Sequence, residues 1–422
     1  MNVSTPPVSL SSPGAWTCPF CALHCDSFGL THDAPPRLLG SDCPRALAAL
    51  ARHAAVHEPP AALVDGQPQP LDAAVAEAAA RLAGWRQPLL GGLGTDVAGA
   101  RALYRLAART GAVYDHAHGD SLMHAVRALQ DRGQFYTTIG EVRTRADLIV
   151  CVGTQGCANY PELFGRFGVD RADSPCRTLV FVGVTPPPGL PERIECVALP
   201  GTGDLFDDLQ QLGALVAHQP VRDAQPGLAD LAQRLHAARY GVLVWEAGVL
   251  PTHGALLVEA LTRIVGTLNR RTRAATFSLG GSDGAYAVNQ TFTWLSGLPL
   301  RTRVSPTGLE HEPLRHAAHR LVAQRAVDGL LWVASFDPQQ LPPAGLPRIV
   351  LGASAMAARL RDAGLLTDCV FVPVATPGLN AAGHVFRTDG SIVLPLVAVR
   401  DDGLPSVAAI ASRIAEQLEA AR

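Results

Sequence analysis

The chain has 422 residues, of which 48% are hydrophobic and 17% are charged, so it is suited to about two to four globular domains and not to a disordered chain. Its 35 basic and 37 acidic residues give a formal net charge of -2, which provides no field to attract nucleic acid or an anionic membrane surface. The apolar runs are of strand length and fall short of the roughly 20 residues that a membrane-spanning helix needs.

The cysteines are unevenly spread along the chain. Four of the nine lie within the first 43 residues, at Cys18, Cys21, Cys25 and Cys43. The preceding residues 1–14 contain neither the basic nor the apolar segment of an export signal, which predicts a cytoplasmic protein. In a reducing compartment, crowded cysteines indicate a metal site in preference to disulfide bonds.

The spacing of these four cysteines suits a compact metal centre. They form C-x2-C-x3-C, followed after 17 residues by the fourth cysteine. Three neighbouring thiolates can cover one face of the centre, and a fourth from a returning loop completes a four-sulfur shell. Tetrahedral zinc is the rival, although zinc sites usually combine two C-x2-C pairs and the second pair is missing here. We therefore expect an iron–sulfur cluster on these residues, with zinc as the alternative.

Beyond this cysteine-rich head, strand-length apolar runs alternate with helical patterns. A helix is predicted over 69–85, where leucine, valine and alanine recur at helical spacing, and further helices are expected over 205–218, 228–240 and 253–269. Unbroken apolar runs occupy 147–153, 178–184, 241–248, 329–335, 348–354 and 369–374. Continuous hydrophobicity is typical of strands that are covered on both faces. We therefore predict an α/β fold with mainly parallel sheets.

Two irregular segments carry predictions of their own. The glycine-rich stretch 91–96 (GGLGTD) follows a predicted strand but lacks a full GxGxxG motif, which favours a tight turn over a phosphate-binding loop. The proline-rich stretch 338–347 precedes a predicted strand and indicates a hinge or a crossover between domains.

The cysteine head followed by alternating α/β segments resembles the molybdopterin oxidoreductases. Three stretches, 138–162 (TIGEVRTRADLIVCVGTQGCANYPE), 280–299 (GGSDGAYAVNQTFTWLSGLP) and 383–390 (GHVFRTDG), narrow the resemblance to the B-subunit family of formylmethanofuran dehydrogenase over nearly the whole chain. The resemblance implies doubly wound domains, a [4Fe-4S] cluster on the four head cysteines and a molybdenum or tungsten pterin. It implies a head over 1–58, an α/β segment over 59–145, a Rossmann-like domain over 146–326, and a segment over 327–422 that returns to pack with 59–145.

One departure from the family pattern decides how the cofactor cleft is interpreted. In the active enzymes that the chain resembles, a metal-ligating cysteine or selenocysteine precedes His-Gly-Pro-Ser. The matching stretch here is HAHGDS (116–121), in which Ala117 stands at the ligand position and Asp120 at the proline position. A methyl group cannot bind a metal, and Cys151 cannot replace the ligand because it lies in a predicted buried strand. We therefore expect molybdopterin and tungstopterin to be absent.

The remaining cleft residues are then expected to be relics. His118 is interpreted as a former proton-transfer residue, and we assign no catalytic residue in this chain. Gly280, Gly281, Asn289 and Gln290 are interpreted as a relic pterin cleft, in which Asn289, Gln290 and Trp294 fasten a loop.

The loss of the ligand resembles the bacterial members of the family, which belong to the formyltransferase/hydrolase complex of methylotrophs. The resemblance implies a redox-inactive scaffold, the B subunit of that complex, in tetrahydromethanopterin-linked one-carbon metabolism from formaldehyde to formate. Its expected partners are the hydrolase, the formyltransferase and the structural C subunit. The alternatives are an active formylmethanofuran dehydrogenase subunit that binds a pterin metal and a [4Fe-4S] cluster, or a small iron–sulfur or zinc protein that acts as an electron carrier or sensor.

Overall fold

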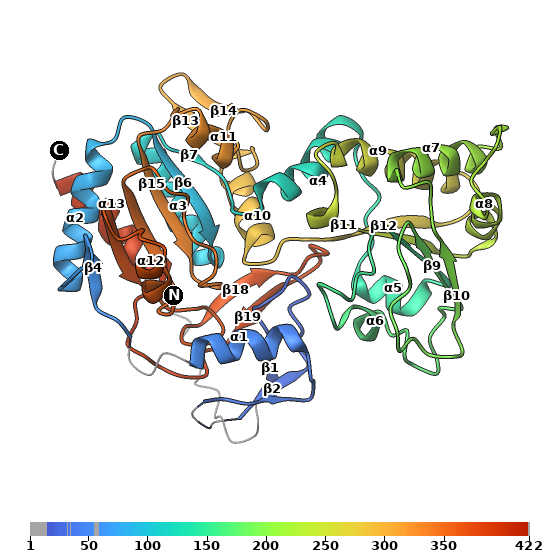
Figure 1. Cartoon of the computed structure of the whole chain (residues 1–422), viewed down its shortest axis with the longest axis horizontal. Helices are drawn as coiled ribbons and strands as arrows, with labels where there is room; N and C mark the ends of the chain where they lie inside the picture. The colour runs from blue at the N-terminus through green and yellow to red at the C-terminus, as the bar shows by residue number, and fades with distance from the viewer. Residues whose placement is uncertain (1–14, 32, 34, 55–58, 421–422) are drawn as a thin grey trace, which may run out of the picture.

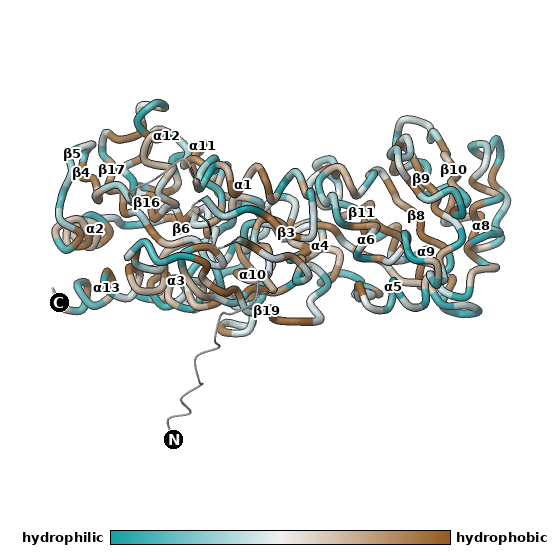
Figure 2. The backbone as a smooth tube through the Cα atoms, turned by 90° about the horizontal axis from the view of Figure 1, so that it is seen from below, coloured by the Kyte–Doolittle hydropathy of each residue, from teal (hydrophilic) through white to brown (hydrophobic). Residues whose placement is uncertain are grey.

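The computed structural model describes residues 15–31, 33, 35–54 and 59–420. Residues 1–14, on which the absence of an export signal is predicted, lie outside the described residues, as do parts of the predicted head. Two α/β lobes lie side by side, with the N-terminal segment 15–54 beneath their junction (Figure 1). Figure 2 shows the elongated outline of this arrangement from below, with many segments that change between hydrophobic and hydrophilic colours along the chain.

The larger lobe is built on a nine-stranded mixed sheet. Its central strands are parallel, and antiparallel hairpins cover both edges. Paired edges leave fewer backbone groups open to association. The strand order is β14 (Gly308–His311), β13 (Thr302–Ser305), β7 (Val113–Tyr114), β6 (Pro88–Gly94), β15 (Gly329–Ala334), β16 (Arg348–Gly352), β17 (Cys369–Pro373), β4 (Ala62–Val64) and β5 (Gln67–Gln69).

Helices cover both faces of this sheet and bury its side chains. One face packs against α2 (Leu71–Gly84), α3 (Val97–Thr110), α10 (Ala285–Ser296) and α13 (Val407–Ala420). The other face packs against α11 (Ala318–Ala323) and α12 (Met356–Asp362). Because both faces are covered, the strands are apolar along their whole length, as their sequences indicate.

The smaller lobe is a five-stranded sheet in which every neighbouring pair is parallel. Its order is β10 (Glu195–Leu199), β9 (Thr178–Val182), β8 (Leu148–Val152), β11 (Gly241–Glu246) and β12 (Ala274–Leu279), which is the order of a doubly wound sheet. One face packs against α7 (Leu205–Val216), α8 (Leu228–Ala237) and α9 (Gly254–Leu268). The other packs against α5 (Ile139–Arg145), α6 (Leu163–Arg166) and the N-terminal segment.

Local sequence signals explain where several of these helices begin and end. The Asp96 carboxylate accepts a hydrogen bond from the Gly99 N–H at 3.0 Å at the start of α3, and Thr138 caps α5 in the same way through the Glu141 N–H at 3.1 Å. Helix α3 ends at Gly111, which adopts a φ of +68° that disfavours other residues.

The N-terminal segment contains β1 (Ala15–Trp16), β2 (Phe28–Leu30), β3 (Leu38–Leu39) and α1 (Pro44–Ala54). It contacts both lobes. The Trp16 indole donates to the Gly378 carbonyl at 2.7 Å, while Ser41 Oγ donates to Glu162 at 2.7 Å. A hairpin of β18 (Gly383–Phe386) and β19 (Val393–Leu396) lies beside this segment (Figure 1). α4 (Gly119–Arg132) and the short turn η1 (Ala247–Val249) lie near the junction of the lobes.

All six strands and four helices predicted from periodicity are present in the structure. The prediction for the glycine stretch 91–96 is wrong, because residues through Gly94 continue β6. Gly92 has a φ of +73°, and a Cβ there would lie 2.6 Å from the Val333 carbonyl oxygen. Glycine is therefore needed here because β6 is bulged and its backbone lies very close to β15.

The prediction of a domain crossover at 338–347 is also wrong. This segment joins β15 to β16, which are adjacent parallel strands of one sheet. The resemblance implies a Rossmann-like domain over 146–326, but β13 and β14 lie within that range and β13 pairs with β7 in the larger lobe.

In the part of the chain that the structure describes, no helix is long and apolar enough to cross a membrane.

Candidate functional site

The lobes meet around a cavity of about 230 Å³ that contains the predicted cleft residues. Its lining is mostly apolar, with side chains from α4, α10 and the loops that follow β12 and β18. The five residues singled out from the sequence are all part of that lining: His118, Gly280, Gly281, Asn289 and Gln290.

Two of these residues are explained by backbone and loop structure. Gly281 has a φ of +85°, and a Cβ at this position would come within 2.7 Å of the Tyr286 side chain. The Asn289 amide oxygen accepts a hydrogen bond from the Leu300 N–H at 3.1 Å, so it fixes the loop that follows α10. Trp294 does not lie inside the cleft as predicted, because its side chain is 69% exposed.

At the edge of the cavity, three side chains join segments that are distant in sequence. His118 Nε2 lies 2.9 Å from Asp283 Oδ2, and Gln340 Nε2 lies 2.9 Å from the same oxygen. His118 precedes α4, Asp283 follows β12 of the smaller lobe, and Gln340 lies in the loop after β15 of the larger lobe. We call these residues the interlobe cluster.

The electrostatics of the interlobe cluster favour a fixed internal arrangement. Burial raises the pKa of the Asp283 carboxyl, but the hydrogen bond and charge of His118 outweigh this effect and bring the pKa below its usual value. Burial lowers the pKa of His116 to about 3, so this imidazole is neutral. Its Nδ1 accepts from the His118 N–H at 2.9 Å, which leaves Nε2 to donate to the Asp283 carbonyl at 3.2 Å.

Ala117 and Asp120 depart from the motif that the chain resembles, and the structure shows the contacts of each. Ala117 is exposed, its N–H donates to the Gly92 carbonyl at 3.0 Å, and its methyl group contains no metal-ligating atom. Asp120 accepts a hydrogen bond from Arg301 Nη2 at 2.6 Å. The predicted position of Cys151 is confirmed, because it is fully buried in β8.

Arg301 also forms a buried ion pair that the sequence did not reveal. Arg301 Nε lies 3.2 Å from both carboxylate oxygens of Asp115, and the two side chains are 3% and 2% exposed. Asp115 additionally accepts from the Ala318 N–H at 2.8 Å at the start of α11. This pair therefore ties the end of β7 to the segments around β13 and α11.

Sequence reasoning also missed Asp283 and Gln340 as members of the site. Asp283 lies within the GGSDG stretch (280–284), of which only Gly280 and Gly281 were predicted to line the cleft. Its position after a strand that ends a parallel sheet was the available signal, because such loops line crevices in α/β proteins. No local pattern marks Gln340, which lies in the proline-rich loop.

The four head cysteines lie close to one another and are all buried. Burial is the main cause that raises the pKa of the Cys18, Cys21 and Cys25 thiols, and neighbouring cysteines raise it further. Among the residues with a described position, no group of three or more histidine, cysteine, aspartate and glutamate side chains is arranged to hold a metal ion. Neutral thiols pack as small apolar groups, whereas metal binding requires thiolates.

Replacing Cys21 with serine is expected to loosen residues 15–43. If the four sulfurs share a metal, removal of one ligand weakens the centre that connects the turn at Cys18–Cys25 to the start of α1. We expect iron and sulfide, or failing these zinc, in the purified wild-type protein and less metal in Cys21→Ser. Hydrogen exchange by mass spectrometry measures the loosening.

Cys196→Ser provides the matched control, because this cysteine is exposed on the edge strand β10. It should change neither metal content nor exchange. A wild-type head that contains no metal but shows strong protection from exchange would contradict the metal hypothesis.

The fold and the site together define a class of protein. The chain is an α/β protein built on a nine-stranded mixed sheet and a five-stranded parallel sheet, with a cavity where the two lobes meet.

Comparisons with known proteins identify the family. The B subunit of the formyltransferase/hydrolase complex Fhc of Methylorubrum extorquens is 30% identical over 338 residues, which are 79% of this chain and 90% of the relative. The crystal structure of the FhcABCD complex from the same organism, with methylofuran, contains a chain with a TM-score of 0.73 and 29% identity; the match covers 86% of this chain and 99% of that one. No protein-family profile matches the sequence.

More distant similarity reaches the tungsten enzymes. The B subunit of the tungsten-containing formylmethanofuran dehydrogenase 2 of Methanocaldococcus jannaschii is 24% identical over 308 residues, which are 68% of each chain. The chain belongs to the B-subunit family of the formyltransferase/hydrolase complex, which is related to the B subunits of formylmethanofuran dehydrogenase.

Proposed function

We propose that this chain is a redox-inactive structural subunit of a formyltransferase/hydrolase complex in the cytoplasm. The observation that carries the proposal is Ala117 at the metal-ligand position, beside an interlobe cluster whose polar groups bond to one another. The chemistry of formyl transfer and hydrolysis then belongs to other subunits, in a one-carbon pathway linked to tetrahydromethanopterin.

The interlobe cavity supports the absence of a pterin cofactor. Its volume of about 230 Å³ is below the roughly 300–1,000 Å³ of typical small-molecule sites. Asp283 bonds to His118 and Gln340, so the polar groups nearest the former metal position are already satisfied. Neither molybdopterin nor tungstopterin finds a protein ligand there.

The head is proposed to retain a metal centre on Cys18, Cys21, Cys25 and Cys43. Four buried cysteines without disulfide bonds supply the kind of ligand that an iron–sulfur cluster or zinc uses, although their described positions do not form a ready-made metal site. When bound, such a centre would hold the turn at Cys18–Cys25 against the start of α1. A stabilising role fits a segment that hydrogen-bonds to both lobes, as Trp16 and Ser41 do.

An exposed apolar surface supports the role of a subunit. The side chain of Trp294 packs edge-on against Phe386, with ring centroids 5.1 Å apart, and Phe386 pairs with Val393 in the β18–β19 hairpin. We call this surface the Trp294 patch. Contiguous exposed apolar surface marks interaction sites, so we propose that another subunit of the complex covers it. Its exposed members are Trp294 and Val393, and Leu295, Ile392 and Val397 are further exposed apolar residues near them in the sequence.

Metal analysis and activity of the purified complex test this function. We expect no stoichiometric molybdenum or tungsten and no oxidation of the formyl carrier with artificial electron acceptors. His118→Ala should leave hydrolase and transferase activities near the wild-type level, whereas loss of a general acid or base lowers activity by roughly 10²–10⁴-fold. Deletion of the whole chain should lower both activities because the complex fails to assemble.

Ala117→Cys serves as the corresponding control. This change restores a thiol but leaves Asp120 bonded to Arg301, so redox activity should not appear. Stoichiometric tungsten, or loss of activity in an intact His118→Ala complex, would refute the scaffold function.

A further inference from the structure

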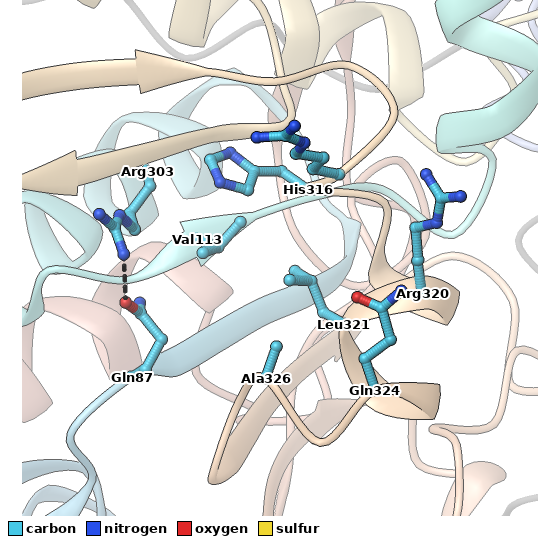
Figure 3. A pocket seen from close by; sticks show the side chains of 9 residues that line it. Gln87, Val113, Arg303, His316, Arg320, Leu321, Gln324 and Ala326 are labelled. Atoms are coloured by element: carbon cyan, nitrogen blue, oxygen red, sulfur yellow. Dashed lines mark hydrogen bonds between the residues drawn. The ribbon is translucent and has the colours of Figure 1, made fainter.

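A second cavity lies on the larger lobe, between β7, β13 and α11. Its volume is about 480 Å³, which is within the range of small-molecule sites. In Figure 3, Arg303 and His316 lie toward one side, Arg320 and Gln324 come from the α11 region, and Val113 and Leu321 lie between them.

The lining combines positive charge with an apolar floor. Arg303, Arg315 and Arg320 contribute guanidinium groups, and no aspartate or glutamate is among the described lining residues. Val113, Leu321 and Ala326 provide apolar surface. The family comparison and the interlobe cavity assign no role to this site.

These arginines have unused hydrogen-bonding capacity. Arg315 has no hydrogen-bond or ion-pair partner among the described residues, and Arg320 Nη1 donates only to the Leu314 carbonyl, at 3.3 Å. Arg303 pairs with Glu310 at 2.7 Å and donates to the Gln87 amide oxygen at 3.2 Å (Figure 3), but its Nε is buried without a partner. The guanidinium groups that a ligand in the cavity can reach are therefore those of the exposed Arg315 and Arg320.

We propose that this cavity binds a small ligand with at least two clustered anionic oxygen groups, either phosphate or carboxylate. Planar guanidinium groups recognise both through paired charge-assisted hydrogen bonds. Gln324 adds a neutral hydrogen-bonding group, and the apolar floor accommodates the uncharged part of the ligand. The proposal is independent of the structural role assigned to the chain.

Calorimetric titration of the full chain, alone and in its purified complex, tests the site. Inorganic pyrophosphate and citrate are the probes, which separate phosphate from carboxylate recognition. We expect saturable binding of at least one probe with a stoichiometry of one, weakened at least about tenfold in Arg315→Ala/Arg320→Ala, because this double variant removes the two guanidinium groups with free donors. Binding should also weaken at higher ionic strength.

Arg101→Ala is the matched control, because Arg101 is an exposed arginine on helix α3 and does not line the cavity. The Arg101→Ala chain should bind each probe with the same affinity as the wild type. Circular dichroism verifies that the double variant is folded. No saturable binding of either probe, unchanged affinity in the folded double variant, or binding that disappears in the complex because a partner subunit covers the cavity would overturn the proposal.

Discussion

Trp294→Glu is expected to separate this chain from the other subunits of its complex while leaving its fold intact. The indole is 69% exposed, so its replacement removes little of the core. Tryptophan is enriched among residues whose truncation costs roughly 2–4 kcal/mol of binding free energy, which corresponds to an affinity at least about 30-fold weaker. A carboxylate placed in an apolar interface adds a desolvation cost. Co-purification and analytical ultracentrifugation measure the loss of assembly.

Leu256→Glu provides a matched control for this experiment. Leu256 is 49% exposed on α9 of the smaller lobe and does not belong to the Trp294 patch. It should assemble like the wild type. Normal co-purification of the Trp294→Glu chain would show that the patch is not covered by a partner. A parallel thermal melt of each isolated chain separates lost assembly from lost folding.

Asp115→Ala is expected to cause the largest loss of stability among the changes considered. Asp115 and Arg301 are both almost fully buried, and removal of Asp115 leaves the buried guanidinium with only the exposed Asp120 as a counter-charge. Breaking a buried pair in this way typically costs about 3–5 kcal/mol. The Ala318 N–H also loses its acceptor at the start of α11. Urea unfolding followed by circular dichroism measures the change.

Asp230→Ala gives the comparison for an exposed pair. Asp230 bonds to Arg234 at 2.7 Å within α8, where both side chains contact solvent. Such pairs contribute about 0–1 kcal/mol, because solvent screens the charges and the side chains lose entropy. If Asp115→Ala were no more destabilising than Asp230→Ala, the Asp115–Arg301 pair would not hold β7, β13 and α11 together.

The class of fold and most of its elements could be predicted from the sequence. The run 241–248 is apolar without alternation, and the corresponding strand β11 is covered on both faces. Continuous hydrophobicity in the sequence therefore indicates that the sheet is buried on both sides. The interpretation of Ala117 as a lost metal ligand also comes from the sequence alone, and it stays a prediction. Residues 91–96 show where this reasoning fails. Glycine with a positive φ occurs both in turns and in bulged strands, so the glycines alone do not distinguish the two.

The tertiary structure alone decided which distant residues share a site. Asp115 and Arg301 are 186 positions apart, and His118 and Gln340 are 222 apart, so no spacing rule connects them. Their meeting depends on the smaller lobe being inserted between β7 and β13, after which the chain returns to the first sheet. Strand periodicity determines which residues face a core, but sheet order depends on long-range pairing. That pairing also brings Arg303 on β13 opposite Arg320 on α11, which forms a cationic cavity in a chain whose net charge is nearly zero.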